Sequence, residues 1–187
     1  MNIFILDQDP VKAAQQQCDK HIPKMVVESA QMLSTTHRMI DGTMERRPSK
    51  SGSMLQYYKL DDYREQLLYK AVHFNHPCTV WTRENSSNYN WHFIHFVALC
   101  EEYTYRYGKT HATYEKLGTV LRNPPRNIPH ADGKSPFKLA MGSNPECISE
   151  DAVKSYRAFY QTKQSRFAMK WTKRKVPEWF NYASVWF

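Results

Sequence analysis

The alternation of hydrophobic and polar positions is clearest between residues 21 and 40, where it predicts a long helix over about 23–40. Small and apolar side chains recur every three or four positions and should face the core. They are Ile22, Met25, Ser29, Met32, Leu33, Thr36 and Ile40. At roughly 100° per residue, a polar stripe runs beside them at the edge of the buried face. It holds His21, Lys24, Glu28, Gln31 and Thr35.

This polar stripe has two interpretations. A histidine, a lysine and a carboxylate held together at a partly buried edge can shift one another's pKa values, as acid–base chemistry requires. The same spacing also fits an ordinary amphipathic helix in which Lys24 and Glu28 form an ion pair one turn apart. The pattern by itself leaves both interpretations open.

Helical periodicity recurs along the rest of the chain. Asp9 followed by Pro10 is typical of a helix start, here of a short helix through about residue 17. Further helices are predicted over 61–74, 89–107, 111–121 and 150–173. Strand signals are confined to the first six residues, which predict a short extended segment. The fold class is therefore mainly α.

Three other segments lack helical periodicity. Residues 43–53 are polar and basic, and they predict a mobile loop that orders on a phosphate backbone. Residues 122–145 are proline-rich and predict a long irregular connection, and 176–187 form an aromatic C-terminal tail. At 187 residues the chain is long enough for a core of its own, so we expect a single helical domain over 1–187.

The charge of the chain favours a polyanionic partner, because its net charge is +8. No acidic residue occurs from 152 to 177, and aromatic residues are interleaved with the cations there. The cations are Lys154, Arg157, Lys163, Arg166, Lys170, Lys173, Arg174 and Lys175. Cations neutralise phosphates and aromatic faces stack on unpaired bases, so the segment predicts a nucleic-acid interface. Alternatively, the aromatic residues are core, as Tyr156, Tyr160, Phe167 and Trp171 are expected to be.

Several other classes of protein are not expected. No apolar run is long enough to span a membrane, and the N-terminus lacks the basic start of a signal peptide. The four cysteines are widely spaced, which is typical of reduced thiols in the cytoplasm. The histidine pairs 73/76 and 92/95 have no second cluster to complete a zinc site. We expect a cytoplasmic monomer with no membrane partner, no metal and no cofactor.

Short motifs in four places carry a resemblance to a known family. His21 and Glu28 stand seven positions apart on the predicted helix, and 177–182 reads P-x-W-F-x-Y. Between them lie N-H-P at 75–77 and an E…R-Y-G element ending at Gly108. Together they resemble the pyrimidine-dimer DNA glycosylases, small helical enzymes of phages and bacteria. The chain is also similar to a group of phage-encoded proteins, which implies the cytoplasm of an infected bacterium.

The resemblance implies a site and a chemistry. The α-amine of Met1 would attack the sugar C1′ and form a Schiff base, and Glu28 would stabilise the developing charge and serve the later proton transfers. His21 would hold the opened sugar or a phosphate. Gln31 occupies a position where the family usually has arginine. The tail residues Trp179, Phe180 and Tyr182 would lie against the DNA.

One feature departs from that family. An α-amino group has a pKa of about 7.7–8.0 and is a competent nucleophile near neutral pH. Initiator methionine is normally removed only before a small residue, however, and residue 2 is Asn2. Met1 should therefore remain. Lys20 or Lys24 can supply the amine instead if burial or a nearby cation lowers its pKa. In a third alternative, the lyase step is absent.

Arg83 is a further candidate for DNA binding, because it precedes a predicted helix start with which it can hold a phosphate. The alternative is a local ion pair with Glu84.

Three functions follow from the sequence. The first is a glycosylase of DNA repair, with or without lyase activity, that excises a damaged or modified base after extruding it from double-stranded DNA. The second is a phage transferase that modifies a hypermodified pyrimidine in DNA. The third is a non-catalytic nucleic-acid-binding phage protein.

Overall fold

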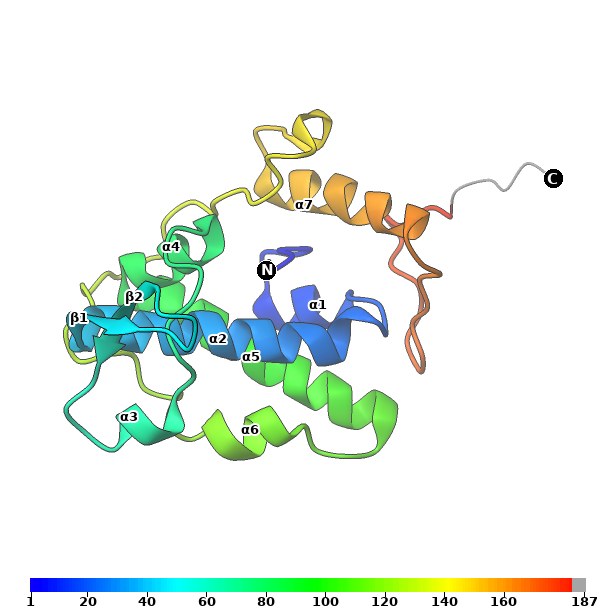
Figure 1. Cartoon of the computed structure of the whole chain (residues 1–187). Helices are drawn as coiled ribbons and strands as arrows, with labels where there is room; N and C mark the ends of the chain where they lie inside the picture. The colour runs from blue at the N-terminus through cyan, green and yellow to red at the C-terminus, as the bar shows by residue number, and fades with distance from the viewer. Residues whose placement is uncertain (183–187) are drawn as a thin grey trace.

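The structure is a computed structural model that describes residues 1–182 of the 187. Helices are the predominant regular elements of the described chain, which also contains one small antiparallel sheet (Figure 1). Its α-helices are α1 (Pro10–Gln15), α2 (His21–Asp41), α3 (Arg64–Leu67), α4 (Pro77–Glu84), α5 (Ser86–Tyr107), α6 (Ala112–Leu117) and α7 (Ala152–Gln161). The strands are β1 (Thr43–Pro48) and β2 (Met54–Lys59), and short 3-10 turns cover Pro145–Cys147 and Thr162–Ser165.

Helices α2 and α5 are the long elements of the core, and α2 lies across α5 (Figure 1). The prediction of a helix over 23–40 is confirmed, and its apolar stripe is buried from Ile22 to Thr36, with Met25, Met32 and Leu33 fully buried, whereas Ile40 at its end is half-buried. Asn85 is the N-cap of helix α5, and its side chain accepts a hydrogen bond from the Asn88 backbone N–H. The helix ends before Gly108, which has the left-handed conformation. The sequence predicted this end correctly, whereas the helix starts three residues before the predicted position 89.

The first six residues form an extended segment that pairs with no strand. The segment lies between α2 and α7 (Figure 1), and residues 2–6 are buried. Side chains satisfy its backbone in place of a sheet: Gln17 Nε2 donates to Ile3 O at 3.1 Å, and Arg157 Nε donates to Leu6 O at 2.8 Å. Phe4 takes a left-handed φ of 55° and packs on Phe159 and Tyr160.

The prediction of a mobile loop over 43–53 is wrong, because this segment forms β1 and the turn of a β-hairpin. The register runs from Thr43 opposite Lys59 to Pro48 opposite Met54. Gly52 closes the turn with a φ of +86°, and its N–H donates to Ser49 O. Both faces of the hairpin are largely exposed, so the usual alternation of apolar and polar positions does not mark the strands.

Two predicted helices are shorter than expected because tertiary partners take their backbone groups. The segment 61–74 is helical only at Arg64–Leu67, since the buried Arg38 binds the carbonyls of Leu68 and Tyr69. The helix predicted over 150–173 ends at Gln161, and an irregular segment follows a 3-10 turn. There the Asp19 N–H donates to Lys170 O at 2.8 Å, and the Thr172 N–H donates to Asp19 Oδ1 at 2.9 Å. No helix within residues 1–182 is long and apolar enough to cross a membrane.

Candidate active site at the chain's N-terminus

The N-terminal amine meets the carboxylate of Glu28. Met1 N lies 3.7 Å from Glu28 Oε2, and the backbone N–H of Asn2 donates to the same oxygen at 3.0 Å. One turn earlier on α2, Lys24 Nζ lies 3.5 Å from Glu28 Oε1. The Glu28 side chain is 15% exposed and that of Lys24 62% exposed. A carboxylate therefore faces two amines at the partly buried edge that the polar stripe predicted.

Buried contacts fix the position of the amine. The Met1 side chain is only 3% exposed, and its sulfur lies 3.9 Å from Thr79 Oγ1 on α4. On the other side, Asn2 Nδ2 donates to Ala140 O at 3.0 Å, and Asn2 Oδ1 accepts the N–H of Phe4 at 2.9 Å. The first two residues are thus held by their side chains on both sides of the backbone, which orients the amine toward α2.

His76 also belongs to this site, although the sequence analysis considered it only within the N-H-P motif and a histidine pair. Its ring caps α4, where Nδ1 accepts the Cys78 N–H at 3.2 Å, and it also contacts the Met1 backbone. Burial lowers the pKa of His76, and the charges of the N-terminal amine and His73 lower it further. The Met1 backbone and Glu28 oppose that decrease. His76 is therefore neutral at neutral pH and sits beside the amine.

The structure does not bring His21 to the carboxylate of Glu28. The His21 ring is buried under the N-terminal segment, with Nδ1 2.6 Å from Tyr160 Oη, and it stacks on Phe4 at a centroid distance of 4.9 Å. Burial lowers its pKa to about 4, and nearby lysines, first among them Lys24, add to the decrease. His21 packs in the interior, and its predicted contact with the opened sugar stays a prediction.

The last two residues of the polar stripe differ in exposure, because Thr35 is fully buried. Gln31 is half-buried on the same side of α2 as Glu28. Lys20, an alternative amine in the sequence interpretation, is exposed with its Nζ 4.6 Å from the centroid of the Phe167 ring. Only Lys24 of the two candidate lysines has an ion pair with Glu28. Within residues 1–182, Glu28 thus forms an ion pair with one lysine, Lys24, in addition to the N-terminal amine.

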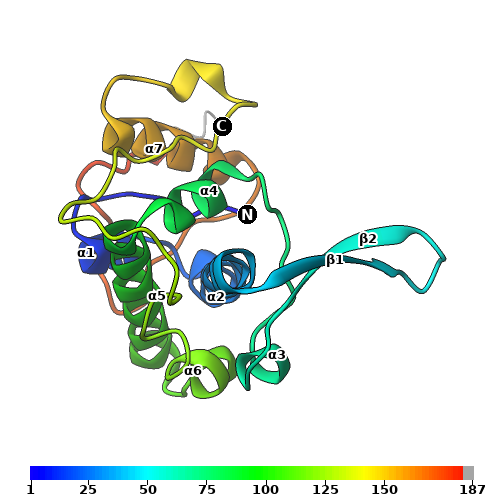
Figure 2. The ribbon, with the colours of Figure 1, turned by 90° about the vertical axis from the view of Figure 1, so that its left-hand side faces the viewer.

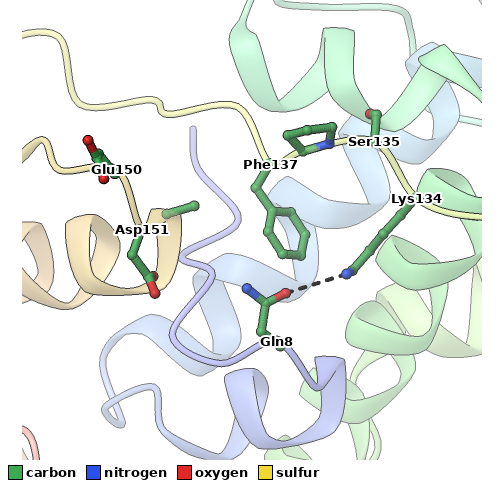
Figure 3. A pocket seen from close by; sticks show the side chains of 8 residues that line it. Gln8, Lys134, Ser135, Phe137, Glu150 and Asp151 are labelled. Carbon is green, nitrogen blue, oxygen red and sulfur yellow. Dashed lines mark hydrogen bonds between the residues drawn. The ribbon is translucent and has the colours of Figure 1, made fainter.

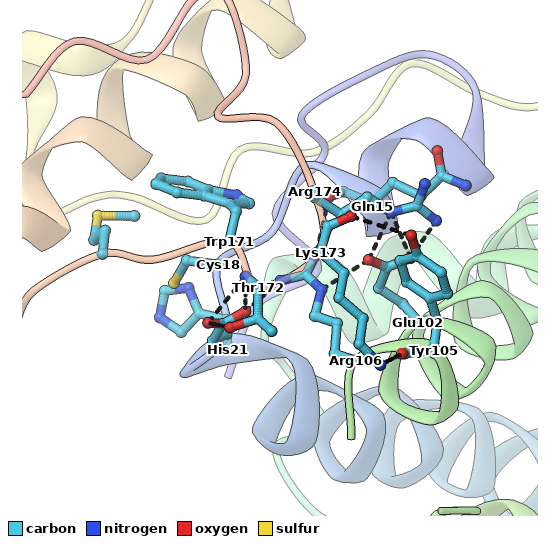
Figure 4. A network of polar contacts seen from close by, with 12 residues as sticks. Gln15, Cys18, His21, Glu102, Tyr105, Arg106, Trp171, Thr172, Lys173 and Arg174 are labelled. Carbon is cyan, nitrogen blue, oxygen red and sulfur yellow. Dashed lines mark hydrogen bonds and ion pairs between the residues drawn. The ribbon is translucent and has the colours of Figure 1, made fainter. Parts of the chain in front are cut away.

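Much of the basic segment is used inside the fold (Figure 4). Arg174 pairs with the buried Glu102, with Nη2 2.8 Å from Oε2, and Lys173 Nζ donates to Tyr105 O at 2.8 Å. Lys163 is buried with its Nζ 3.4 Å from the centroid of the Phe159 ring. Arg166 and Lys170 are exposed. Lys173 is exposed as well, but its Nζ is hydrogen-bonded, so among the five predicted DNA contacts of this segment only Arg166 and Lys170 are exposed without a side-chain partner within residues 1–182.

The aromatic tail packs mainly against the protein. Trp179 Nε1 donates to Gln16 Oε1 at 2.7 Å, and Phe180 is buried against Trp171 at a centroid distance of 4.8 Å. Both rings thus pack against the protein in the structure, whereas the sequence predicted that they lie against DNA. Tyr182 is 59% exposed. The end of the predicted tail, 183–187, lies outside the described residues.

Arg83 lies near the base of the hairpin. Its Nη1 donates to Phe74 O at 2.5 Å, and burial lowers its pKa. Glu84, its predicted alternative partner, instead forms an ion pair with Lys138 and accepts a hydrogen bond from Ser135 Oγ at 2.6 Å. This hydrogen bond to Phe74 O thus links Arg83 to the segment that contains His76.

A separate surface pocket contains none of the predicted site residues. Its lining includes Phe137, Glu150 and Lys134, whose Nζ donates to Gln8 Oε1 at 3.4 Å (Figure 3). Asp151, also in the lining, accepts the Lys154 N–H and so caps α7. Among residues 1–182, no group of three or more His, Cys, Asp or Glu side chains is placed to hold a metal ion. Of the four predicted catalytic residues, Met1, Lys24 and Glu28 thus lie together.

The comparisons with known proteins supply no family for this arrangement. No protein-family model, curated protein or solved structure matches the chain.

Proposed function

We propose that the chain is a DNA glycosylase with associated lyase activity whose nucleophile is the α-amine of Met1. The observation that carries the proposal is the position of Met1 N, 3.7 Å from Glu28 Oε2. A primary amine beside a carboxylate can attack an electrophilic carbon while the carboxylate takes up the proton that the amine loses. The basic net charge of +8 fits a DNA substrate.

The proposed reaction starts on a nucleotide extruded from the duplex. The Met1 nitrogen forms a bond to C1′, the bond between C1′ and the base breaks, and the departing base takes a proton from water. Glu28 stabilises the positive charge that develops at the sugar and accepts a proton from the attacking nitrogen. As the C1′–O4′ bond breaks, Glu28 returns this proton to O4′, and the Schiff base forms. The Glu28 carboxylate, free again, then removes a 2′ proton, and the 3′ phosphate leaves by β-elimination.

Retention of Met1 is part of this proposal. Removal of Met1 would make the nitrogen of Asn2 the chain end, and this nitrogen also lies 3.0 Å from Glu28 Oε2. The buried Met1 side chain, packed on Thr79, would then be lost from the wall of the site. The intact mass of the purified protein gives the state of the N-terminus, and we expect the mass with Met1.

Trapping with borohydride tests the nucleophile. Incubation with a duplex that carries an abasic site or a modified base, followed by reduction, should yield a covalent adduct at the Met1 nitrogen. A chain extended by a few residues before Met1 should lose the adduct, because its amine no longer reaches Glu28. The matched control carries the same extension after residue 187 and should keep it. An adduct on Lys24, mapped by peptide mass, contradicts the assignment of the nucleophile.

The products of the same reaction separate the other two functions. Free base together with cleaved strand supports excision. A changed mass on an intact nucleoside would instead favour the base-modifying transferase. If there is neither adduct, nor base release, nor nucleoside change over a panel of abasic, damaged and hypermodified duplexes, the enzyme proposal fails, and only nucleic-acid binding remains.

A further inference from the structure

The β1–β2 hairpin stands out from the body of the molecule (Figure 2). Three large apolar side chains on it are more than half exposed: Met44 at 52%, Met54 at 55% and Leu55 at 56%. A two-stranded hairpin alone is at best marginally stable in water, and exposed apolar strands invite association. These three exposed side chains therefore indicate a surface that binds a partner rather than a part of the core.

The base of the hairpin is firmly attached. Arg38 Nη1 donates to Tyr58 O at 3.0 Å, Tyr57 Oη donates to the carboxylate of Glu65, and the Tyr58 ring packs edge-on against Phe74 at a centroid distance of 5.4 Å. These contacts set the direction in which the strands leave the body. The N-terminus lies between α4 and α2 on the side from which the hairpin projects (Figure 2).

The two faces of the hairpin differ in their free charge. On one face Arg47 pairs with Glu45 and lies over the Tyr57 ring, with its guanidinium carbon 3.7 Å from the centroid. Arg46 points to the other face, which it shares with Tyr58 by strand alternation. Within residues 1–182, the side chain of Arg46 is exposed and has no hydrogen bond, ion pair or ring contact. Its charge is available to an outside partner.

The face with Arg46 adjoins the candidate active site. Tyr58 on this face contacts Phe74, which stands two positions before His76, and His76 contacts the Met1 backbone. Residues 43–59 carry Arg46, Arg47, Lys50 and Lys59 against a single acid, Glu45. A basic two-stranded ribbon fits a groove of duplex DNA, where exposed methionine and leucine side chains can contact bases or wedge between them.

We propose that the β1–β2 hairpin is an arm that binds the duplex beside the target nucleotide, with Arg46 on a phosphate. The proposal rests on the proposed function, in that the site at Glu28 acts on DNA. Glu28 and Asp41, the end of α2, are 13 positions apart, so about 20 Å separates them at 1.5 Å per residue. At about 3.4 Å per base pair, the arm meets the duplex roughly six base pairs from the target.

Arg46 and Arg47 provide the test, because they are adjacent and equally basic, but only the Arg47 side chain has partners within the protein. Binding of the full chain to an undamaged fluorescent duplex is measured at several salt concentrations. Arg46→Ala should weaken binding about threefold or more and should reduce the salt slope by about one. Arg47→Ala should change both much less. Equal effects of the two substitutions, or no effect of Arg46→Ala, overturn the proposal.

Duplex length gives a second measurement. A duplex with about twelve base pairs on both sides of an abasic target is shortened to about four on one side at a time. Shortening on the side that the arm occupies should remove the difference between the wild-type chain and Arg46→Ala. Shortening on the other side should preserve it. A difference that survives both truncations overturns the proposal.

The two proposals fail in different ways. If the adduct with abasic DNA forms but Arg46→Ala binds like the wild type, the arm is wrong and the proposed function stands. If no adduct forms but Arg46→Ala still weakens duplex binding selectively, the arm stands as a DNA-binding element and the glycosylase chemistry is wrong. Thermal melting of both variants checks folding, and equal melting temperatures are expected because both side chains are exposed.

Discussion

At the scale of single residues, Glu28 is the group on which the site is organised. Its Oε2 faces Met1 N and the N–H of Asn2, and its Oε1 faces Lys24. His76 adds a neutral ring beside the amine. The two oxygens of the carboxylate thus contact different partners. The nitrogens of Met1 and Asn2 at Oε2 are held in place by buried contacts, whereas Lys24 at Oε1 is exposed.

Glu28→Gln keeps the shape of the side chain and removes its charge. We expect the rate of adduct formation with abasic DNA to fall by about 100-fold or more, because Gln cannot take up a proton. Binding of an undamaged duplex should change little. Lys24→Gln is the matched control on the same stripe and should keep the adduct. Full activity of Glu28→Gln would remove the carboxylate from the mechanism.

At the scale of elements, Arg38 on α2 determines the path of the chain after the hairpin. The guanidinium is buried and binds carbonyls of Tyr58, Glu65, Leu68 and Tyr69, and it pairs with the Glu65 side chain at 2.5 Å. These bonds hold the backbone where it leaves helical geometry, at Leu68 with its extended ψ of 146°. The predicted helix over 61–74 is therefore reduced to α3, and the base of the hairpin is attached to α2.

Replacing Arg38 should destabilise the protein strongly. Arg38→Met removes the donors for these carbonyls and leaves the carboxylate of Glu65 without its partner, for an expected loss of about 3–5 kcal/mol in the free energy of unfolding. Urea unfolding followed by circular dichroism measures it. Arg47→Met, on the exposed hairpin, is the control and should cost less than about 1 kcal/mol. A small loss at Arg38 would mean that water replaces these contacts.

At the scale of the whole molecule, buried neutral histidines link α2 and α5 to their neighbours. Burial lowers the pKa of His21, His37 and His95 to about 4 in each case. His37 Nε2 lies 2.7 Å from Tyr89 Oη, and His95 Nδ1 lies 2.9 Å from Pro10 O. An unfolded chain would bind protons at these rings near pH 6.5, well before the folded chain does.

This difference predicts a fold that weakens in mild acid. Between about pH 6.5 and pH 4 the unfolded state binds more protons than the folded state, so the free energy of unfolding falls as the pH falls. Denaturant unfolding at a series of pH values should show a loss of several kcal/mol over that window. His95→Gln should make the dependence on pH shallower. A flat profile from pH 7 to pH 5 would contradict the burial of these rings as neutral groups.

The sequence by itself determined the features that depend on neighbours within a turn or two of helix. The stripes of α2, the N-cap of α1, the glycine that ends α5 and the excess of positive charge could all be predicted, because helix periodicity and capping act over three or four residues. The polar stripe also marked Glu28 and Lys24 as neighbours.

Only the tertiary structure decided which distant groups meet. Met1 reaches Glu28 because buried contacts at Thr79 and Ala140 hold the first two residues. His21 turns into the core toward Tyr160, and Trp179 toward Gln16, although their local sequence allows an exposed position. Strand pairing likewise depends on the partner strand rather than on local periodicity, which is why the hairpin was missed. Packing between segments far apart in sequence decided which groups join Glu28 and Lys24 at the site, and local patterns carry no information about those contacts.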